Sequence, residues 1–433
     1  MSDSLIGLAG FGLALLLVLL RVPVAVAMGV VGAAGFAYLN GWPALAFVMG
    51  SAPFEATNPY TLSVVPLFIA MGVFATHAGL STSLFRAVHA FVGHFRGGLA
   101  MAAIGACAGF GAICGSSLAT AATMGRVALP EMRRHGYADS LATASIAAGG
   151  TLGVLIPPSI LLVIYALLTE QSIGALFLAA VFPGLLGTAL YMAAVSARLR
   201  LDPTLADKAE RLPWAARARI AAGVWPVLGL FVVVVGGIYV GLFSPTEAAA
   251  VGAVGAFLMA LVRRALDRAT FRACLLETAQ LTAMIFLILI GAGLFNYFIE
   301  TTGLPQFLVA QVEGVGLTPF GVILILMAFY IVLGCFMDAL SMILLTVPFV
   351  FPLVTSLGID PIWFGVLLVT VAELGLITPP VGMNLFVIMG VARDVSLGTV
   401  SRGVVPFLLA DVVRLALLIA FPAIALWLPA SGG

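Results

Sequence analysis

The stretch from Met101 to Ser159 constrains the fold most, because its long apolar runs are interrupted where a membrane helix should be continuous. A glycine-rich run, Gly109–Ser117, comes first, and a second run ends in Gly149-Gly-Thr-Leu-Gly-Val-Leu-Ile-Pro-Pro-Ser159. Helix breaks at membrane depth release backbone N–H and C=O groups, which are tolerated only where they line a cavity or are buried in protein. Transporters place ion and substrate sites at such breaks, so the pattern predicts a transporter.

The composition places the rest of the chain in a membrane. The 433 residues are 63% hydrophobic and 9% charged, whereas soluble domains carry about 25% charged residues. The first apolar run follows no basic segment and ends at Arg21, so we expect a retained helix rather than a signal peptide. We therefore predict an all-α polytopic protein of a bacterial inner membrane, surrounded by lipid. The net charge of +1 gives no indication of nucleic acid as a partner.

Many apolar segments are long enough to cross about 30 Å of hydrocarbon. The predicted spans are Leu5–Leu20, Val22–Leu39, Thr61–Ala78, Ser140–Leu168, Ile173–Ala197, Ile220–Gly241, Ala248–Val262, Ala273–Ile299, Pro361–Val391 and Val404–Leu428. Two further runs, Leu99–Leu129 and Pro319–Leu357, contain glycine and polar residues at mid-length. Each of these two could be one long helix, two crossings, or a re-entrant hairpin that enters and leaves on one face.

Charge favours hairpins that open to opposite sides. Positively charged loops stay in the cytoplasm, and the segment 198–219 has six basic residues against three acidic ones. The run 99–129 follows Arg96 and precedes Arg133 and Arg134, whereas the flanks of 319–357 contain no lysine or arginine. The first run is therefore predicted to open to the cytoplasm and the second to the outside.

An internal repeat supports this prediction. At a constant offset of 222 in the numbering, proline matches proline and glycine matches glycine in the pairs Pro130/Pro352, Gly136/Gly358, Gly153/Gly375 and Pro157-Pro158/Pro379-Pro380. The basic pair Arg133-Arg134 matches the uncharged Thr355-Ser356, which indicates that corresponding loops lie on opposite sides. We predict an inverted-topology repeat with a midplane site. Its parts are residues 1–197 (hairpin about 99–131, broken helix about 139–168), a cytoplasmic connection 198–219, and residues 220–433 (hairpin about 319–357, broken helix about 361–391).

Hydroxyl and carboxylate groups stand at the predicted hairpin tips. Ser116 and Ser117 follow the first glycine run, and with exposed carbonyls they offer the oxygen ligands that a sodium ion needs; close helix packing through small residues is the alternative. Asp338 lies deep in an apolar run, where a carboxylate indicates function by default, although it could cap a helix instead. Glu373 precedes the second broken segment and is equally consistent with a structural role.

Three other features favour structural roles. Ser244-Pro-Thr-Glu247 is typical of a capping box that begins a helix. Leu80–Phe95 indicates an amphipathic interfacial helix, whose histidines we expect to be solvated rather than bound to metal. Arg126 is expected to meet a lipid phosphate or a helix C-terminus rather than a ligand.

The combination of motifs resembles the large membrane subunit of tripartite ATP-independent periplasmic (TRAP) transporters, of the DctM type. The matching runs are Phe110-Gly-Ala-Ile-Cys-Gly-Ser-Ser117, Gly153-Val-Leu-Ile-Pro-Pro-Ser159, Ser244-Pro-Thr-Glu-Ala-Ala-Ala250, Phe336-Met-Asp-Ala339 and Gly375-Leu-Ile-Thr-Pro-Pro-Val-Gly-Met-Asn384. The resemblance implies a sodium-driven importer with an elevator mechanism, which receives small organic anions (carboxylates) from a periplasmic substrate-binding protein. It also implies a small four-helix membrane subunit, and no cofactor apart from Na⁺ as coupling ion.

The resemblance also implies two sodium sites between hairpin tips and helix breaks. The residues carried over to the first site are Gly111, Cys114, Ser116, Ser117, Gly149, Thr151 and Pro157, and those of the second are Gly334, Asp338, Ser341, Thr378 and Gly382. Cys114 departs from the serine expected there, so only its carbonyl is suited to sodium. Half-helix N-termini favour anions, and we expect the substrate at Gly115, Ser159 and Asn384.

Two alternatives remain open. A stand-alone symporter for sodium and divalent anions, of similar architecture, would need no binding protein. An integral-membrane enzyme is disfavoured, because the four histidines and few intramembrane acids provide no nucleophile–base or metal constellation. No P-loop is present, so ATP bound on this chain is not the energy source.

Overall fold

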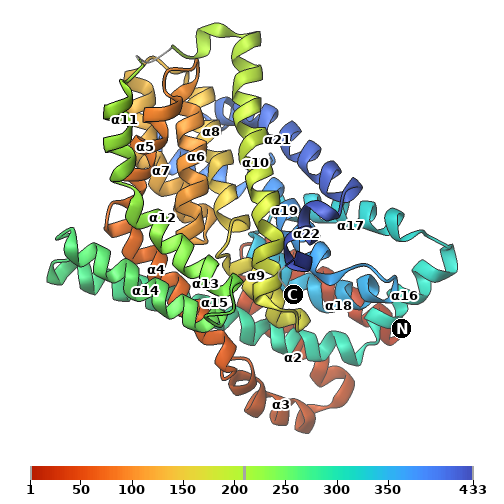
Figure 1. Ribbon diagram of the computed structural model, residues 1–433. Helices are drawn as coiled ribbons and strands as arrows, with labels where there is room; N and C mark the ends of the chain where they lie inside the picture. The colour runs from red at the N-terminus through yellow and green to blue at the C-terminus, as the bar shows by residue number, and fades with distance from the viewer. Residues whose placement is uncertain (1, 208–210, 432–433) are drawn as a thin grey trace.

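The computed structural model describes residues 2–207 and 211–431, and this part of the chain is helical with no β-strand (Figure 1). Among the described residues, seven helices are long and apolar enough to cross a membrane, or up to eight if a bent pair counts as one span. The chain is therefore a multi-pass membrane protein, as predicted. Lys208, which contributes to the predicted basic connection, lies outside the described residues.

The first part of the chain forms α1 (Asp3–Leu19), α2 (Val24–Asn40), α3 (Trp42–Glu55), η1 (Tyr60–Ser63), α4 (Val64–His77) and α5 (Leu80–Val92). The helices predicted over 5–20, 22–39 and 61–78 are present, and α5 coincides with the amphipathic segment. Helix α3 was not predicted. Its Pro43 lies in the first turn. Backbone N–H groups of the first turn have no intrahelical acceptor, so a proline there is compatible with the start of a helix.

The first interrupted stretch consists of α6 (Gly98–Cys114), α7 (Ser117–Arg134), α8 (Asp139–Leu155), α9 (Ile160–Thr169) and α10 (Ile173–Leu201), followed by η2 (Pro203–Leu205). Helices α6 and α7 form a pair joined at Gly115 and Ser116, which excludes one continuous helix over 99–129. Gly115 has a φ of +64°, a conformation that glycine adopts without steric cost. The predicted span 140–168 is broken between Leu155 and Ile160, where Pro157-Pro158 is a cis peptide.

The second half begins with α11 (Trp214–Ala222), α12 (Trp225–Phe231), the π-helical turn η3 (Val232–Gly236) and α13 (Gly237–Tyr239). The span predicted over 220–241 falls on a helix pair, Trp214–Ala222 and Trp225–Tyr239, that is long and apolar enough for one span but is bent by 51°. Pro226 follows the bend, and a proline cannot continue the hydrogen-bond ladder of a preceding helix. Helix α14 (Pro245–Val262) starts with the predicted capping box, which is confirmed at Ser244 and Glu247.

The remaining helices are α15 (Arg268–Thr301), α16 (Leu304–Val315), α17 (Pro319–Gly334), α18 (Ala339–Ser356), α19 (Pro361–Ile377), α20 (Met383–Val391), α21 (Leu397–Ala420) and α22 (Ala423–Ser431). Helices α17 and α18 again form a pair joined by a short break, and α19 and α20 are the two halves of a broken helix. Helix α16 was not predicted. The single span predicted over 404–428 is wrong, because the chain breaks at Phe421 and Pro422.

The helix bounds repeat at the offset found in the sequence. Helices α7 and α18 begin and end at corresponding positions of the repeat, and so do α8 and α19. The N-cap residues Ser116 and Asp338 correspond in the same way, and both Pro-Pro pairs are cis. The two halves of the chain therefore contain the same sequence of helix pair and broken helix.

Contacts between turns define one end of the molecule around Arg133, which we call the basic end. Arg133, in the last turn of α7, forms ion pairs with Asp139 (2.7 Å) and with Asp394 (2.8 Å), which precedes α21. The amide of Ala138 donates to Leu205 O at 3.0 Å, so the end of α10 lies there too. In contrast, the Tyr165 hydroxyl of α9 donates to Pro361 O (2.7 Å), which places the start of α19 beside α9.

The helices form two groups, one of which contains the interrupted stretches. Helix α8 packs against α6, α7, α10, α19 and α21, and α19 packs against α17 and α18, so the interrupted stretches form one body. Helix α15 packs mainly against α2 and α4, and α4 against α14 (Figure 1). With 34 residues, α15 is about 51 Å long at the usual helical rise. It is therefore longer than the hydrocarbon core of a bilayer, which is about 30 Å thick.

Candidate functional site

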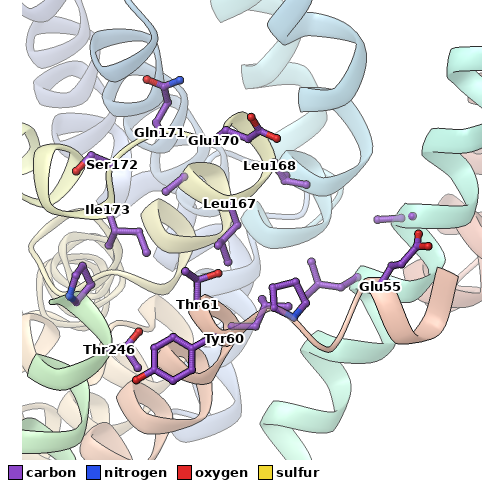
Figure 2. Close-up of a pocket in the computed structure, with 18 of the residues that line it drawn as sticks. Glu55, Tyr60, Thr61, Leu167, Leu168, Glu170, Gln171, Ser172, Ile173 and Thr246 are labelled. Atoms are coloured by element: carbon purple, nitrogen blue, oxygen red, sulfur yellow. The ribbon is translucent and has the colours of Figure 1, made fainter. Parts of the chain in front are cut away.

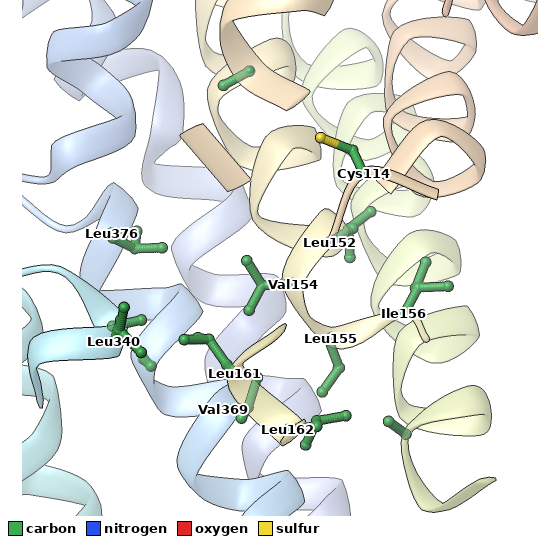
Figure 3. Close-up of a cluster of buried hydrophobic side chains, with 14 of the residues drawn as sticks. Cys114, Leu152, Val154, Leu155, Ile156, Leu161, Leu162, Leu340, Val369 and Leu376 are labelled. Atoms are coloured by element: carbon green, nitrogen blue, oxygen red, sulfur yellow. The ribbon is translucent and has the colours of Figure 1, made fainter. Parts of the chain in front are cut away.

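Both helix-pair tips line one small cavity, which we call the tip cavity. Its volume is about 150 Å³, and its lining includes Gly115–Leu118 from the first tip and Asp338–Leu340 from the second. Val154, Leu161, Leu340 and Leu376 approach one another there from α8, α9, α18 and α19 (Figure 3). Leu281, Met284 and Ile285 of α15 form the facing wall. Segments from the two halves of the chain thus meet at one point.

Three helices begin at the tip cavity. The first residues of α7, α9 and α18 are Ser117, Ile160 and Ala339, and all three line the cavity. The first N–H groups of a helix have no intrahelical partner, and the helix dipole makes this end partially positive. An arrangement of three such ends around one cavity can bind an anion without a basic side chain.

The first tip combines close packing with free oxygen atoms. A Cβ added to Gly111 would lie 2.1 Å from Gly153 Cα, so the tip and α8 meet backbone to backbone. Ser116 Oγ accepts from the Ala119 amide at 3.4 Å and thereby caps α7. The Thr120 hydroxyl is fully buried and has no hydrogen-bond partner among the described residues. The glycines thus pack closely, as the alternative to a sodium site predicted, while hydroxyl groups also lie beside the break.

The other first-site candidates lie around this tip. Cys114 lies at the end of α6 beside Gly115, and Gly149 faces the Cys107 side chain, whose Sγ would be 3.1 Å from an added Cβ. Pro157 lies within the break of the broken helix. The Thr151 hydroxyl is already engaged, since it donates to Ala148 O at 2.8 Å and lies 3.2 Å from the Tyr191 hydroxyl.

The second tip has the same construction with a carboxylate in place of a hydroxyl. Asp338 caps α18, because Oδ1 accepts from the Ser341 amide at 3.0 Å and Oδ2 accepts from the Ser341 hydroxyl. A Cβ on Gly375 would lie 2.5 Å from Gly334 Cα, which repeats the glycine contact of the first tip. The predicted alternative for Asp338, a helix cap, is therefore observed, and the same residue lines the tip cavity.

Two hydrogen bonds to backbone carbonyls stabilise the second break. The Thr378 hydroxyl donates to Leu374 O at 2.6 Å, and the Gly382 amide donates to Cys335 O at 3.4 Å. Gly382 has a φ of +57° and stands directly before α20. The break and the second tip are thus in direct contact.

Only one of the three substrate candidates lines the tip cavity. Gly115 does, whereas Ser159 and Asn384 are fully buried and are not among its lining residues. Ser159 Oγ accepts from the Leu162 amide at 3.3 Å and caps α9. Asn384 donates through Nδ2 to Ala147 O (3.1 Å), so it ties the second broken helix to α8.

A buried charged cluster beside the breaks was not predicted. Arg414 Nη2 lies 2.8 Å from Glu373 Oε2 and 2.9 Å from Asp411 Oδ1, and all three side chains are fully buried. The Tyr191 hydroxyl donates to Asp411 Oδ2 at 2.6 Å. The sequence signal was an aspartate and an arginine three positions apart in the apolar run of α21, since ionisable residues within membrane segments are costly and rarely lack a role.

This cluster, which we call the Arg414 cluster, joins four helices. Glu373 Oε1 accepts from the amide of Leu155, the last residue of α8 before its break (3.0 Å). A Cβ on Gly187 of α10 would lie 2.3 Å from Arg414 Nη1, so glycine is needed to admit the guanidinium. The cluster thus connects α8, α10, α19 and α21 between the two broken helices.

A larger cavity lies at the end of the molecule away from the basic turns. We call it the outer cavity; its volume is about 810 Å³ (Figure 2). Tyr60 and Thr61 line it near η1, Glu170 lines it from the α9–α10 turn, and Glu55 lies at its rim. Leu289, Ala292, Gly293 and Asn296 of α15 also contribute to the lining. Helix α15 therefore contributes lining residues to both the outer cavity and the tip cavity.

The apolar helices and the paired helix breaks are those of a multi-pass membrane transporter. In the described part of the chain, no group of three His, Cys, Asp or Glu residues could hold a metal ion. The chain belongs to the DctM family, because the model of the tripartite ATP-independent periplasmic transporter DctM component matches residues 11–424. The predicted family is thus confirmed, and the chain is a transporter component rather than an enzyme.

Known permeases are similar in sequence to most of this chain, and a solved transporter has a similar fold. The C4-dicarboxylate TRAP transporter large permease protein DctM of Pseudomonas aeruginosa is 41% identical over 87% of this chain and 88% of its own. The isethionate TRAP transporter permease protein DctMQ of Oleidesulfovibrio alaskensis is 33% identical over 97% of this chain and 65% of its own length. The YdaH transporter of Alcanivorax borkumensis has a similar fold, with a TM-score of 0.63, 17% identity and 90% of both chains covered.

Proposed function

We propose that the chain is the large transmembrane subunit of a sodium-coupled importer of small organic anions in a bacterial inner membrane. A periplasmic substrate-binding protein delivers the anion, and a small membrane subunit completes the transporter. The single observation that carries this proposal is the tip cavity, where both helix-pair tips and the ends of both broken helices meet.

The anionic nature of the proposed substrate is supported by the helix ends at this cavity. Helices α7, α9 and α18 begin at its lining, and the N–H groups at helix N-termini favour carboxylate or sulfonate oxygens. The names of the Pseudomonas and Oleidesulfovibrio relatives refer to C4-dicarboxylates and to isethionate, both small organic anions. Gly115 is the contact that we assign to the substrate first, with Ser159 and Asn384 shaping the breaks behind it.

Sodium coupling is supported by the oxygen groups beside each break. Around the first, Ser116, Ser117 and the unpartnered Thr120 hydroxyl lie near the backbone contact between Gly111 and Gly153. At the second, the Asp338 carboxylate belongs to the tip whose Cys335 carbonyl accepts from Gly382 of the break. Sodium bound at both places would neutralise the Asp338 carboxylate and add positive charge beside an anionic substrate.

Transport by alternating access is supported by the repeat. We propose that the two halves are inverted, since the turn before α8 lies at the basic end through Arg133 and Asp394, whereas the turn before α19 is bonded to α9 through Tyr165. The two helix pairs and the two broken helices then move together as an elevator against α2, α4, α14 and α15. Inverted repeats with a midplane site are the usual construction of such transporters.

The partner subunits are supported by the family and by one relative. This chain spans only 65% of the DctMQ permease protein, so that relative contains a further segment that this chain does not match. We assign the small membrane subunit to that segment. The stand-alone symporter remains the alternative outcome of an uptake experiment.

Uptake by proteoliposomes tests the proposal. The chain is reconstituted with its small subunit and offered a panel of organic acids, with and without an inward sodium gradient and with and without the binding protein. Uptake that requires both sodium and the binding protein is expected. Uptake indifferent to the binding protein would favour the stand-alone symporter, and uptake without sodium would refute both sodium sites.

Asp338→Asn separates sodium binding from helix capping. Asparagine caps a helix about as well as aspartate, so the unfolding midpoint should hardly change, while the loss of the charge should raise the sodium concentration for half-maximal uptake by at least about tenfold. Asp360→Asn is the matched control, since Asp360 also caps a helix, α19, but does not line the tip cavity. Equal sodium dependence of both variants would remove Asp338 from the site.

A further inference from the structure

A third cavity lies beside α7, on the side of the tip cavity toward Arg133, which we predict to face the cytoplasm. This inner cavity, of about 650 Å³, is bounded by the end of α4, the start of α5, one face of α7 and Glu277 of α15. Its polar lining consists of Thr76, His77, Ser81, Thr82, Thr123 and Arg126, together with Glu277. The end of α4 is itself held by a basic residue, since Arg263 Nη1 donates to Ala78 O at 3.3 Å. Since α7 runs from Ser117 at the tip cavity to Arg133 at the basic end, the inner cavity lies between these two places.

The inner cavity continues the tip cavity along the same two helices. On α7, Ser117 and Leu118 line the tip cavity, and Ala119 to Val127 contribute the next face to the inner one. On α15, Leu281 lines the tip cavity and Glu277 lines the inner cavity, one helical turn away. The rise of α7 from Ser117 to Arg126 is about 14 Å along the helix. An anion leaving the tip cavity toward the cytoplasm would pass Arg126 next.

Arg126 has its hydrogen-bonding groups available. Its side chain is exposed, it forms no salt bridge among the described residues, and its one hydrogen bond is a long contact of Nε with Ala122 O at 3.4 Å. The terminal guanidinium nitrogens remain free to bind a carboxylate in the two-pronged geometry that arginine favours. Thr123, one turn before on α7, adds a hydroxyl on the same side of the cavity.

The position that corresponds to Arg126 in the second half of the chain has no basic side chain. Position 348, which matches Arg126 in the repeat, is Pro348 and lines the outer cavity. The ionisable groups that line the outer cavity are Glu55, Glu170 and Tyr60, with no arginine or lysine among the described residues there. The repeat therefore makes the two cavities similar in position, while the guanidinium makes only the inner one attractive to an anion.

We propose that Arg126 forms a release subsite, which binds an anionic group of the substrate as it leaves the tip cavity toward the cytoplasm. Glu277 shares the cavity and opposes the anion, so the subsite holds its ligand only briefly, as release demands. This inference rests on the proposed function, because it takes the anion from the same transport path. It replaces the expectation that Arg126 meets only a lipid phosphate or a helix end.

The test measures inhibition of uptake by anion on the inside. Proteoliposomes are loaded with increasing concentrations of whichever panel anion the wild type takes up, and external binding protein selects correctly oriented transporters. Arg126→Gln is expected to raise the half-inhibitory internal concentration by at least about tenfold, the effect of one lost hydrogen bond to a charged group. Arg126→Lys keeps the charge and should lose less. Glu277→Gln should shift the value in the opposite direction.

The control is Arg134→Gln on the same helix, since Arg134 lies outside the cavity and pairs at the surface with Glu131. An unchanged half-inhibitory concentration in Arg126→Gln would overturn the subsite, as would an equal change in the external KM. Shifts in the same direction for Arg126→Gln and Glu277→Gln would overturn it too. Wild-type uptake without sodium or binding protein would instead refute the proposed function, on which the subsite rests, whereas normal wild-type coupling with an unchanged value for Arg126→Gln would refute the subsite alone.

Discussion

Removal of the guanidinium from the Arg414 cluster should be among the most damaging single substitutions in this chain. Arg414→Met keeps much of the side-chain volume and leaves Glu373 and Asp411 without their cation. Both carboxylates are fully buried and lie within 2.9 Å of the guanidinium, so no water can replace it without rearrangement of the helices. Loss of one partner from a buried ion pair costs about 3–5 kcal/mol, and we expect a destabilisation of that size.

The cost comes from the unpaired charge, which a compensating variant can show. A triple variant, Arg414→Met with Glu373→Gln and Asp411→Asn, removes all three charges while retaining their approximate shapes. Replacement of a whole buried ionic group is often nearly neutral, so the triple variant should recover most of the lost stability. The Leu155 amide still finds an acceptor in the glutamine carbonyl, which keeps the end of α8 in place.

Chemical denaturation of the purified protein in detergent, followed by tryptophan fluorescence, measures these differences. Arg134→Gln serves as the matched control, because this exposed arginine forms a surface ion pair with Glu131, and such pairs contribute at most about 1 kcal/mol. A loss below about 1 kcal/mol for Arg414→Met would refute the reasoning. A triple variant no more stable than Arg414→Met would show that shape, and not unpaired charge, determines the cost.

Further predictions concern the tips and the basic end. Gly111→Ala should displace the first tip, because its Cβ would lie 2.1 Å from Gly153 Cα; overpacking of this kind costs about 1–3 kcal/mol, and both the unfolding midpoint and the sodium dependence of uptake should report it. Asp338→Ala should lose the cap of α18 as well as the charge, so its unfolding free energy should fall by about 1 kcal/mol below that of Asp338→Asn. The Arg133 guanidinium donates to Asp394 and lowers the pKa of that carboxyl, so its stabilising contribution is present near pH 7 and is lost as the pH falls below about 4. Thermal unfolding of Asp394→Asn and wild type should therefore differ near neutral pH and converge in acid; a constant difference would contradict the ion pair.

The sequence by itself determined where the helices are interrupted. Gly115, the Pro157-Pro158 pair and the constant repeat offset located both helix pairs and both broken helices to within a few positions, because glycine and proline act on the local backbone. The capping box at Ser244 followed from the same local chemistry. Where local signals were weak, the predictions were incomplete: α3 and α16 were missed, and the span over 220–241 was predicted without its bend before Pro226.

Only the tertiary structure decided which interruptions meet and which side chains are free. Asp338 and Ser116 come together at one cavity although they belong to different halves of the chain, while Ser159 and Asn384 are buried and do not line it. The neutralisation of Glu373 by Arg414 likewise depends on the packing of α19 against α21, which no local pattern encodes. Local backbone chemistry is determined by neighbours in sequence, whereas burial and ion pairing depend on neighbours in space, and those are set by the packing of the whole chain.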